Sequence, residues 1–397
     1  MKPSKISFLY KNKSEEPIEV WLSAAPGTEG ITFGHEEPIS IHEDNVLGNL
    51  YYFEVPAKKT VSYEADYKDA ARYELKPEER QYFLRSTELI PINEETKRYA
   101  EELTSPFDRD VDKVRSIFDH VRKSFTYTSR LKERGFQQCI RNKKGDCGEL
   151  SAVIASFCRS IQIPCRVMVG SFRGKFQPHA WNEVYLKGRG WVAMDVSLAM
   201  YTFPRHPLRN IGATVRWGAF SNKQRYAEEI EEGRVVFSID PERKLYPAYT
   251  NKSTAMKDTV YKVGAKELAW GFESMEGAAP YMQPIYPRLN ESYAAVKTKD
   301  LLGTYKVTPK NKFDYYSYLI KIQSFFIAAL LIYLSLIATF MQLEPPDWIV
   351  NSIESLTAIL LGIFSLLTII RKEYNFPILV LCILFTFSIV SFLYGLV

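Results

Sequence analysis

The spacing of apolar residues predicts β-structure at the start of the chain. In Ile18–Leu22 and again in Val61–Tyr67, apolar side chains alternate with other residues. A period of two is typical of strands with one buried face, and turn-prone stretches such as Ala25–Gly30 separate such runs. We therefore predict a small β-sandwich-like domain over residues 1–88.

The period changes to three and four residues after this region. Apolar positions recur in this way over Val111–Phe125, and Asn93 is suitably placed to cap a helix over Glu94–Leu103. The same spacing returns over Leu150–Ile161, which predicts a further helix with one buried face.

Three strand candidates follow that helix along the chain. They are Cys165–Phe172, His179–Leu186 and Trp191–Val196, and the Lys-Gly-Arg-Gly sequence between the last two is a turn signal. This order predicts a mixed α+β core over residues 89–250, in which a helix packs on an antiparallel sheet. Residues 251–315 are expected to form an extension and linker.

The C-terminal part, residues 316–397, contains three long apolar runs. Ile322–Leu343 and Tyr374–Val397 carry no charged residue, and Trp348–Ile370 carries only Glu354. A helix of about 20 apolar residues crosses the hydrocarbon core of a bilayer. Three such runs in succession predict three transmembrane helices, with the lipid bilayer as a partner.

The charges that flank these runs predict an orientation. The first linker, Glu344–Asp347, is acidic, whereas the first run is preceded by a group of basic residues, Lys306, Lys310, Lys312 and Lys321. Because basic flanks favour the cytoplasmic side, residues 1–315 are expected inside and the C-terminus outside. The first residues, MKPSKISFLYKNKSEEPIEV, contain no apolar run of signal-peptide length, which favours the same arrangement.

Composition narrows the function classes. The net charge of +5 over 397 residues is small, and the basic residues are scattered, so nucleic acid is not an expected partner. The five cysteines are odd in number and irregularly spaced, which argues against a disulfide framework. Because no CxxC pair or Cys/His cluster occurs, we expect neither a metal site nor a cofactor.

Cys147 differs from the other cysteines in its surroundings. It stands at the start of the helix predicted near Leu150, among small or polar residues in the sequence Gly-Asp-Cys-Gly-Glu. The free N–H groups at a helix N-terminus favour a thiolate, which is the reactive form of cysteine. By contrast, Cys158 and Cys165 occupy apolar periodic positions that are typical of buried structural cysteines.

His179 and Asp195 lie on two consecutive strand candidates. In an antiparallel hairpin, the residue numbers of directly opposed positions add to a constant. For His179 and Asp195 this sum is 374, which centres the hairpin on Lys187, within the predicted turn. Cross-strand contact would let the carboxylate hold one imidazole nitrogen while the other faces a thiol. This pattern predicts a Cys147–His179–Asp195 catalytic triad.

Roles for the three residues follow from general chemistry. Cys147 would attack an acyl carbonyl, His179 would accept and return the proton, and Asp195 would orient the imidazole. The Cys147 backbone N–H is placed to stabilise the oxyanion. The upstream side chains that are candidates for a second donor are weak ones, Tyr127, Gln137 and Gln138.

Several motifs in order resemble the transglutaminase-like core of the papain-like superfamily. They are GDCGELSAVIASFCRSIQIPCRVMVGSF and HAWNEVYLKGRGWVAMDVS, preceded by Phe-Thr-Tyr at residues 125–127. The resemblance spans about residues 125–200 and implies that Cys147, His179 and Asp195 are nucleophile, base and orienting acid. It implies no metal for the chemistry. Val196 and Ser197 depart mildly from the residues that usually follow the acid.

Three functions fit these features. A cysteine peptidase or amidase would release its acyl-enzyme to water and act on proteins or peptides. A protein-glutamine transglutaminase would release the same intermediate to an amine, with the same triad. A catalytically idle, membrane-bound scaffold would use the fold only to bind protein. An intact triad favours the enzymes, and hydrolysis is the expected reaction; the sequence indicates no oligomeric state.

Overall fold

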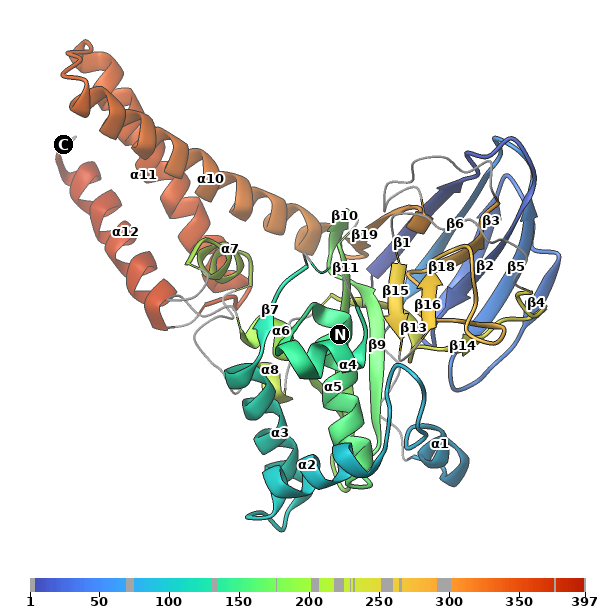
Figure 1. The fold of residues 1–397 in the computed structure, drawn as a ribbon. Coiled ribbons are helices and arrows are strands. Elements are labelled where there is room, and N and C mark those ends of the chain that lie inside the picture. Colours follow the sequence, from blue (N-terminus) through green and yellow to red (C-terminus); the bar gives the residue numbers. More distant parts are fainter. Residues whose placement is uncertain are drawn as a thin grey trace. The chain divides into compact units, whose positions relative to one another are not determined.

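The computed structural model of the chain forms two compact units (Figure 1). One comprises residues 1–200 and 224–309, and the other residues 201–223 and 310–397. The four domain ranges expected from the sequence stay predictions. The structure describes residues 4–68, 75–129, 131, 134–175, 177–200, 207–217, 225–228, 230, 233–250, 260–263, 266–290, 301–374 and 376–395.

Two antiparallel sheets form the β-rich part of the first unit. One has the order β10-β19-β1-β6-β3, with strands Gly174–Lys175, Thr304–Pro309, Ser4–Lys11, Thr60–Tyr67 and Thr28–Gly34. The other has the order β18-β2-β5-β4, with strands Ile285–Arg288, Ile18–Ala24, Asn49–Val55 and Ser40–His42. Each sheet therefore includes a strand from the region after residue 284, for which the sequence pattern indicated only an extension.

The inner faces of these sheets share one hydrophobic core. Burial alternates along β1, where Ile6, Phe8 and Tyr10 are buried and their neighbours face outward. Phe33 on β3 contacts the ring of Tyr51 on β5 at 5.0 Å between centroids. The predicted period of two is confirmed along β6, where Val61 to Tyr67 alternate between buried and more exposed positions, whereas β2 is buried on both faces from Val20 to Ala24.

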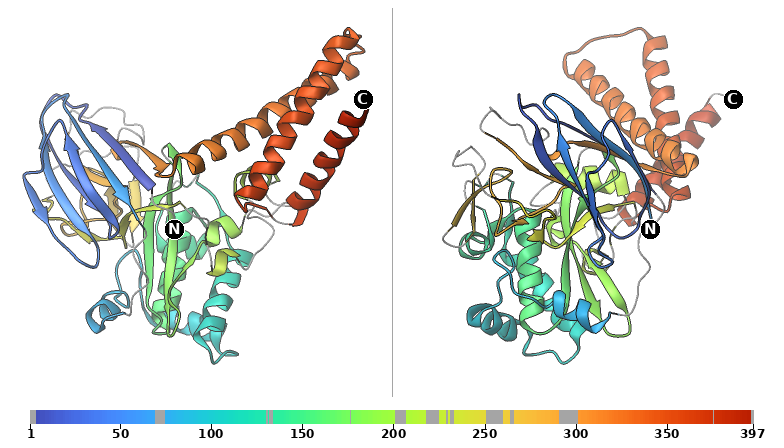
Figure 2. Two further views of the ribbon diagram at one scale, coloured as in Figure 1. Left: turned by 180° about the vertical axis from the view of Figure 1, so that it is seen from behind. Right: turned by 90° about the vertical axis from the view of Figure 1, so that its right-hand side faces the viewer.

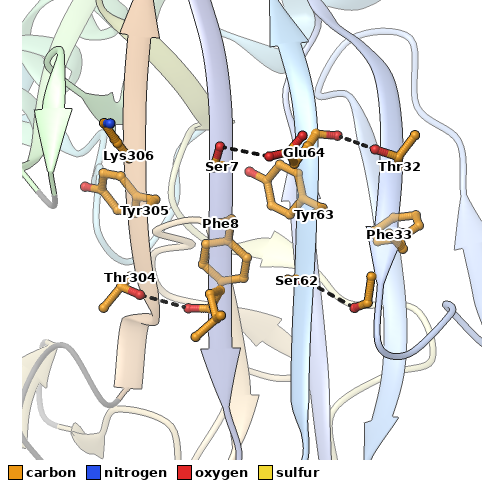
Figure 3. A pocket seen from close by; sticks show the side chains of 12 residues that line it. Ser7, Phe8, Thr32, Phe33, Ser62, Tyr63, Glu64, Thr304, Tyr305 and Lys306 are labelled. Carbon is orange, nitrogen blue, oxygen red and sulfur yellow. Dashed lines mark hydrogen bonds between the residues drawn. The ribbon is translucent and has the colours of Figure 1, made fainter.

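A shallow hollow lies across β19, β1, β6 and β3 (Figure 3). Serine and threonine side chains line it together with apolar and aromatic ones. Ser7 Oγ lies 3.4 Å from Glu64 Oε1, and Ser62 Oγ lies 3.1 Å from the Gly34 carbonyl oxygen. Neither Cys147 nor His179 lines this hollow. It belongs to the sheet surface and not to the predicted site.

A further antiparallel sheet and the helices packed on it form the next part of the first unit. The sheet has the order β12-β11-β9-β13, with strands Gly190–Met194, Pro178–Leu186, Cys165–Ser171 and Val235–Ile239. Helix α5 (Cys147–Ser160) packs on β9 and β11, and α2 (Glu94–Thr104), α3 (Asp110–Ser124) and α4 (Phe136–Asn142) pack around α5 (Figure 1). The predicted α+β architecture, a helix on an antiparallel sheet, is confirmed.

Short elements complete this unit. They are α1 (Pro77–Tyr82), α6 (Val196–Ala199), α8 (Arg225–Glu228), β7 (Thr126–Tyr127), β8 (Lys144–Gly145), β14 (Arg243–Lys244), β15 (Val260–Val263), β16 (Lys266–Ala269) and β17 (Ala278–Ala279). The parallel pair β7–β8 leads directly into the start of α5, which fixes where that helix begins.

The register of β11 and β12 differs from the predicted one. Leu186 pairs with Gly190 and Asn182 with Met194, so paired positions add to 376, not 374. The turn therefore centres on Gly188, whose φ of +78° suits glycine, and not on Lys187. Asp195 lies just beyond β12, at the cap of α6, rather than opposite His179 within the ladder.

The second unit contains the apolar C-terminal helices. Among the residues described, α10 (Lys312–Phe340) and α11 (Asp347–Ile370) are long and apolar enough to cross a membrane. They run side by side in Figures 1 and 2, and α7 (Pro207–Trp217) contacts α10. The third expected span, Tyr374–Val397, contains helix α12 (Phe376–Gly395), which is not one of these two candidates. Residues 375, 396 and 397 of the expected span lie outside the described residues.

Polar side chains connect α10 to the segment after α11. Lys321 Nζ lies 2.6 Å from Glu373 Oε2 and also donates to the Arg216 carbonyl of α7 at 2.9 Å. Arg371 Nη1 lies 2.8 Å from Asp314 Oδ1. These pairs hold the ends of α10 and α11 together within this unit.

Candidate active site

The N-terminus of α5 presents Cys147 as its first residue. Asp146 is the N-cap, and its Oδ1 accepts a hydrogen bond from the Gly148 backbone N–H at 2.8 Å. In return, the Glu149 carboxylate accepts the Asp146 backbone N–H at 2.9 Å. This capping box explains why the helix begins here and leaves the thiol at its positive end.

Arg134 braces the same turn. Its guanidinium pairs with the Asp146 carboxylate, and Arg134 Nε lies 3.1 Å from Glu149 Oε1. One cation thus serves both carboxylates of the capping box. The sequence did not predict this ion pair, because Arg134 lies 13 residues before Cys147, outside its helix, and belongs to no recognisable motif.

The Cys147 thiol lies against β11. Cys147 is half-buried, whereas Cys139, Cys158, Cys165 and Cys382 are buried. Its sulfur is hydrogen-bonded to the backbone of Ala180, the residue after His179. Burial raises the pKa of the Cys147 thiol to about 11, and the Ala180 hydrogen bond and Arg134 oppose that rise only in part. The thiolate expected from the helix N-terminus alone is therefore not the resting form at neutral pH.

His179 and Asp195 are in direct contact. His179 Nε2 lies 2.7 Å from Asp195 Oδ2, and both side chains are buried. The Phe172 ring packs beside the imidazole, with 4.6 Å between ring centroids. Because the carboxylate engages Nε2, the other ring nitrogen, Nδ1, is left for a second partner.

Asp195 is held from several sides. Its Oδ1 accepts hydrogen bonds from Ser197 Oγ at 2.8 Å and from the Leu198 backbone N–H at 3.0 Å. Its Oδ2 also lies 2.7 Å from Arg234 Nη1. Burial alone would raise the pKa of Asp195, but His179 and Arg234 outweigh it and hold that pKa well below its usual range. The carboxylate is therefore ionised at neutral pH.

Arg234 was not anticipated from the sequence. The structure places Arg234 directly before β13 with 1% of its surface exposed. A charged residue at the head of a largely apolar strand was the only signal available. Such a residue is usually solvated, so no pattern in the sequence indicated that it would lie beside Asp195.

Cys147 opens into a cavity of about 370 Å³. Asp146, Glu149 and Arg134 form one side of it, and apolar side chains such as Trp270 and Leu301 form another. The residues on either side of His179 also line it, but neither Gln137 nor Gln138 does; of the three proposed second donors, only Tyr127 lines the cavity.

Two polar residues of the cavity come from the region beyond the predicted core. Gln283 and Tyr281 both line it, and the Tyr281 hydroxyl lies near Gly148, where an added Cβ would meet it at 3.7 Å. Burial raises the pKa of Tyr281 well above its usual range, so its hydroxyl stays protonated. The segment around residue 281 therefore belongs to the surroundings of the site, although its local sequence carries no signal for that position.

Within the described part of the chain, the arrangement of side chains does not indicate metal binding. None of the residues described belongs to a group of three or more His, Cys, Asp or Glu that could hold an ion. The structure instead brings together the His179 imidazole, the Asp195 carboxylate and the Arg234 guanidinium. The Cys147 thiol, on α5, contacts the strand at Ala180, the residue after His179.

Comparison with known proteins identifies a family for the segment that contains this site. Residues 97–196 match the model of the transglutaminase-like superfamily. A candidate cysteine protease from Cytophaga hutchinsonii is 16% identical, with a TM-score of 0.40 over 49% of this chain and 76% of that one. The periplasmic domain of TgpA from Pseudomonas aeruginosa, bound to ethylmercury, is also 16% identical, with a TM-score of 0.33 over 52% of this chain and 92% of that one.

A third solved structure, a TGase, is 15% identical, with a TM-score of 0.22 over 42% of this chain and 44% of that one. No curated protein matches the chain. The assignment therefore rests on the matched segment, which contains Cys147, His179 and Asp195. Residues 97–196 of this chain form a transglutaminase-like domain.

Proposed function

We propose that this chain is a membrane-anchored thiol enzyme that cleaves amide bonds in proteins or peptides through Cys147, His179 and Asp195. The observation that carries the proposal is the 2.7 Å contact between His179 and Asp195, one residue from Ala180, whose backbone is hydrogen-bonded to the sulfur of the half-buried Cys147. A thiol, an imidazole and an ionised carboxylate in series are the groups that acyl transfer requires.

The proposed reaction has two steps. His179 removes the proton of the neutral Cys147 thiol as sulfur bonds to the substrate carbonyl carbon, and the tetrahedral intermediate then collapses. The C–N bond breaks, the imidazolium returns its proton to the leaving amine, and a thioester remains. Water, deprotonated by the same imidazole, then attacks the thioester and restores the thiol. Asp195 stays ionised throughout and stabilises the imidazolium.

The oxyanion needs two donors near Cys147. The backbone N–H of Cys147, at the first position of α5, has no partner within the helix and is one donor. Gln283 supplies a side-chain amide from the cavity wall, and we propose it as the second. Removal of one such donor typically lowers kcat by about 100- to 1000-fold.

The membrane part of the proposal rests on α10, α11 and α12. We propose that all three cross the bilayer and anchor the enzyme, with residues 1–315 in the cytoplasm and the C-terminus outside. The lysine-rich flank before α10 and the acidic linker before α11 support this orientation.

The test separates hydrolysis from transfer to an amine. The purified full chain is incubated with a glutamine-rich protein and a tagged primary amine, and both peptide products and tag incorporation are measured by mass spectrometry. We expect hydrolysis products without tag from the wild type and none from Cys147→Ala. Cys158→Ala, which alters a buried cysteine of the same helix, serves as the control and should retain activity.

Two outcomes would contradict the proposal in different ways. Tag incorporation that depends on Cys147 would replace hydrolysis by transamidation and keep the triad. Equal product formation by the wild type and Cys147→Ala would refute the thiol mechanism itself.

A further inference from the structure

The proposed reaction makes no use of a buried arginine that touches its machinery. Arg234 is 1% exposed, and its Nη1 lies 2.7 Å from Asp195 Oδ2. The same oxygen lies 2.7 Å from His179 Nε2. One carboxylate oxygen is thus shared by a permanent cation and by the imidazole.

Two aromatic rings hold this guanidinium in place. Arg234 Cζ lies 4.8 Å from the centre of the Phe172 ring and 4.9 Å from that of Trp181. Phe172 also packs against the His179 imidazole at 4.6 Å. The planar guanidinium is the cation best suited to pack against aromatic faces while it forms an ion pair with a carboxylate.

The local strands explain why Arg234 reaches this position. Gly170 of β9 pairs with His179 on one side and with Val236 of β13 on the other. A Cβ at Gly170 would lie 2.8 Å from Trp181 Cη2 and collide with the Val235 carbonyl oxygen. The absence of a side chain at Gly170 therefore lets Trp181 and the head of β13 come close, with Arg234 between the aromatic rings and Asp195.

We propose that Arg234 is a positioning residue that sets the pH at which His179 serves as base. This inference rests on the proposed function and assigns its acid–base balance to a residue outside the triad. Because Arg234 shares the Asp195 carboxylate, the carboxylate stabilises the imidazolium less than it would alone. Loss of Arg234 would therefore strengthen the hold of Asp195 on the imidazolium.

The other charged and titratable groups near His179 do not substitute for Arg234. Asp195 is its partner at the end of β12, and Cys147 faces the next residue of β11 from α5. Arg134 and Glu149 act on Cys147 at the start of α5 and pair with each other. Arg173 follows β9 and lies against Gly233, where a Cβ would collide with it.

The experiment measures how fast iodoacetamide alkylates Cys147 as a function of pH. Mass spectrometry of the Cys147 peptide gives the rate for the full chain between about pH 5 and pH 9, the range in which imidazoles titrate. In the wild type the rate should rise as His179 loses its proton. In Arg234→Gln the midpoint of that rise should move higher by about one pH unit or more, as expected for loss of a unit charge within several ångströms.

Two matched variants keep the test specific. Arg166→Gln removes another buried arginine from an ion pair, with Glu183, four residues further along β11 from His179. It should leave the midpoint near the wild-type value. Arg234→Lys keeps the positive charge but lacks the planar guanidinium, so it should slow alkylation and leave the midpoint of the pH profile nearly unchanged. This variant replaces Arg234→Gln in the test if Arg234→Gln does not fold.

The outcomes are distinguishable from failure of the proposed function. If wild-type Cys147 is alkylated no faster than the buried cysteines, the triad itself is refuted. If the wild type shows the rise and folded Arg234→Gln shares its midpoint, only the role of Arg234 is overturned. That role is also overturned if Arg166→Gln moves the midpoint as far as Arg234→Gln does, or if Arg234→Lys raises it by about one pH unit.

Discussion

Cys147 experiences two opposed influences. The N-terminus of α5 favours a thiolate, but the cavity wall and β11 remove water from the sulfur, and burial prevails. In the proposed mechanism a neutral resting thiol requires His179 as base, because no preformed thiolate is available. The sequence contained the first influence in Gly-Asp-Cys-Gly-Glu; the second depends on residues far along the chain, including Trp270 and Leu301.

Gln283 offers a test of the oxyanion site at the same scale. Gln283→Ala should lower kcat by about 100-fold with little change in KM, because the lost hydrogen bond forms only with the charged intermediate. Gln138→Ala is the control, since Gln138 accepts from Asn142 on the outer side of α4 and lies outside the cavity. Similar losses in both variants would contradict the role of Gln283.

Asp195 should make stability depend on pH. Its pKa is held below its usual range in the folded state, so its contribution is complete above the unfolded value of about 3.9 and is lost as pH falls below that value. Urea unfolding at several pH values should show the wild type losing stability below about pH 4 more steeply than Asp195→Asn. Parallel loss in both proteins would contradict an ionised Asp195 in the fold.

Among the elements of the core, periodicity identified the strands and helices but not their alignment. The helix predicted over Glu94–Leu103 spans Glu94–Thr104 with Asn93 as its cap, and the strand predicted over Cys165–Phe172 spans Cys165–Ser171. The predicted β11–β12 register is shifted by two residues, because the turn was placed around Lys187 and actually centres on the next residue, Gly188. The Lys-Gly-Arg-Gly sequence marks a turn but does not say which of its residues is the centre. Contact of His179 with Asp195 was still correct, since the chain after β12 turns Asp195 back toward the imidazole as the cap of α6.

Long-range pairings were beyond what the sequence could predict. Strands β18 and β19 pair with β2 and β1, which lie more than 200 residues earlier, and no local pattern encodes such a partner. Arg234 meets Asp195 in the same way, through β13 pairing with β9. Sequence spacing therefore predicted the contact between His179 and Asp195, whereas the residues that support it required the fold.

Gly170 links the pairing of β9 to the site. Gly170→Ala should destabilise the fold by several kcal/mol, because its Cβ would collide with the Val235 carbonyl oxygen and must displace β13. Thermal unfolding measures this effect. Gly212→Ala in α7, where a Cβ meets nothing within 4 Å, should be neutral or slightly stabilising. Equal unfolding temperatures for the two variants would contradict the packing described for β9.

For the molecule as a whole, apolar helices determine where the enzyme would act. Helices α10 and α11 expose many large apolar side chains, among them Leu330, Leu336 and Ile359. A continuous apolar surface of this kind is unfavourable in water and is typical of a membrane-embedded region. We expect the full chain to remain in the membrane fraction after extraction with alkaline carbonate. Release into the soluble fraction would contradict membrane insertion.

Orientation has a separate measurement. A reporter enzyme active only outside the cytoplasm, fused to the C-terminus, should be active, and the same reporter at the N-terminus should be inactive. The reverse pattern would place the thiol domain outside and overturn the orientation inferred from the lysine-rich flank.

Activation of Cys147 by His179, on which the whole mechanism depends, can be read from the alkylation rate of that thiol at neutral pH. His179→Ala should lower the rate by about 100-fold or more, because the half-buried thiol then has no base. His120→Ala, which removes a half-buried histidine bonded to Tyr99 instead, should leave it unchanged. Equal rates in the wild type and His179→Ala would show that the imidazole does not act on the thiol and would refute the proposed mechanism.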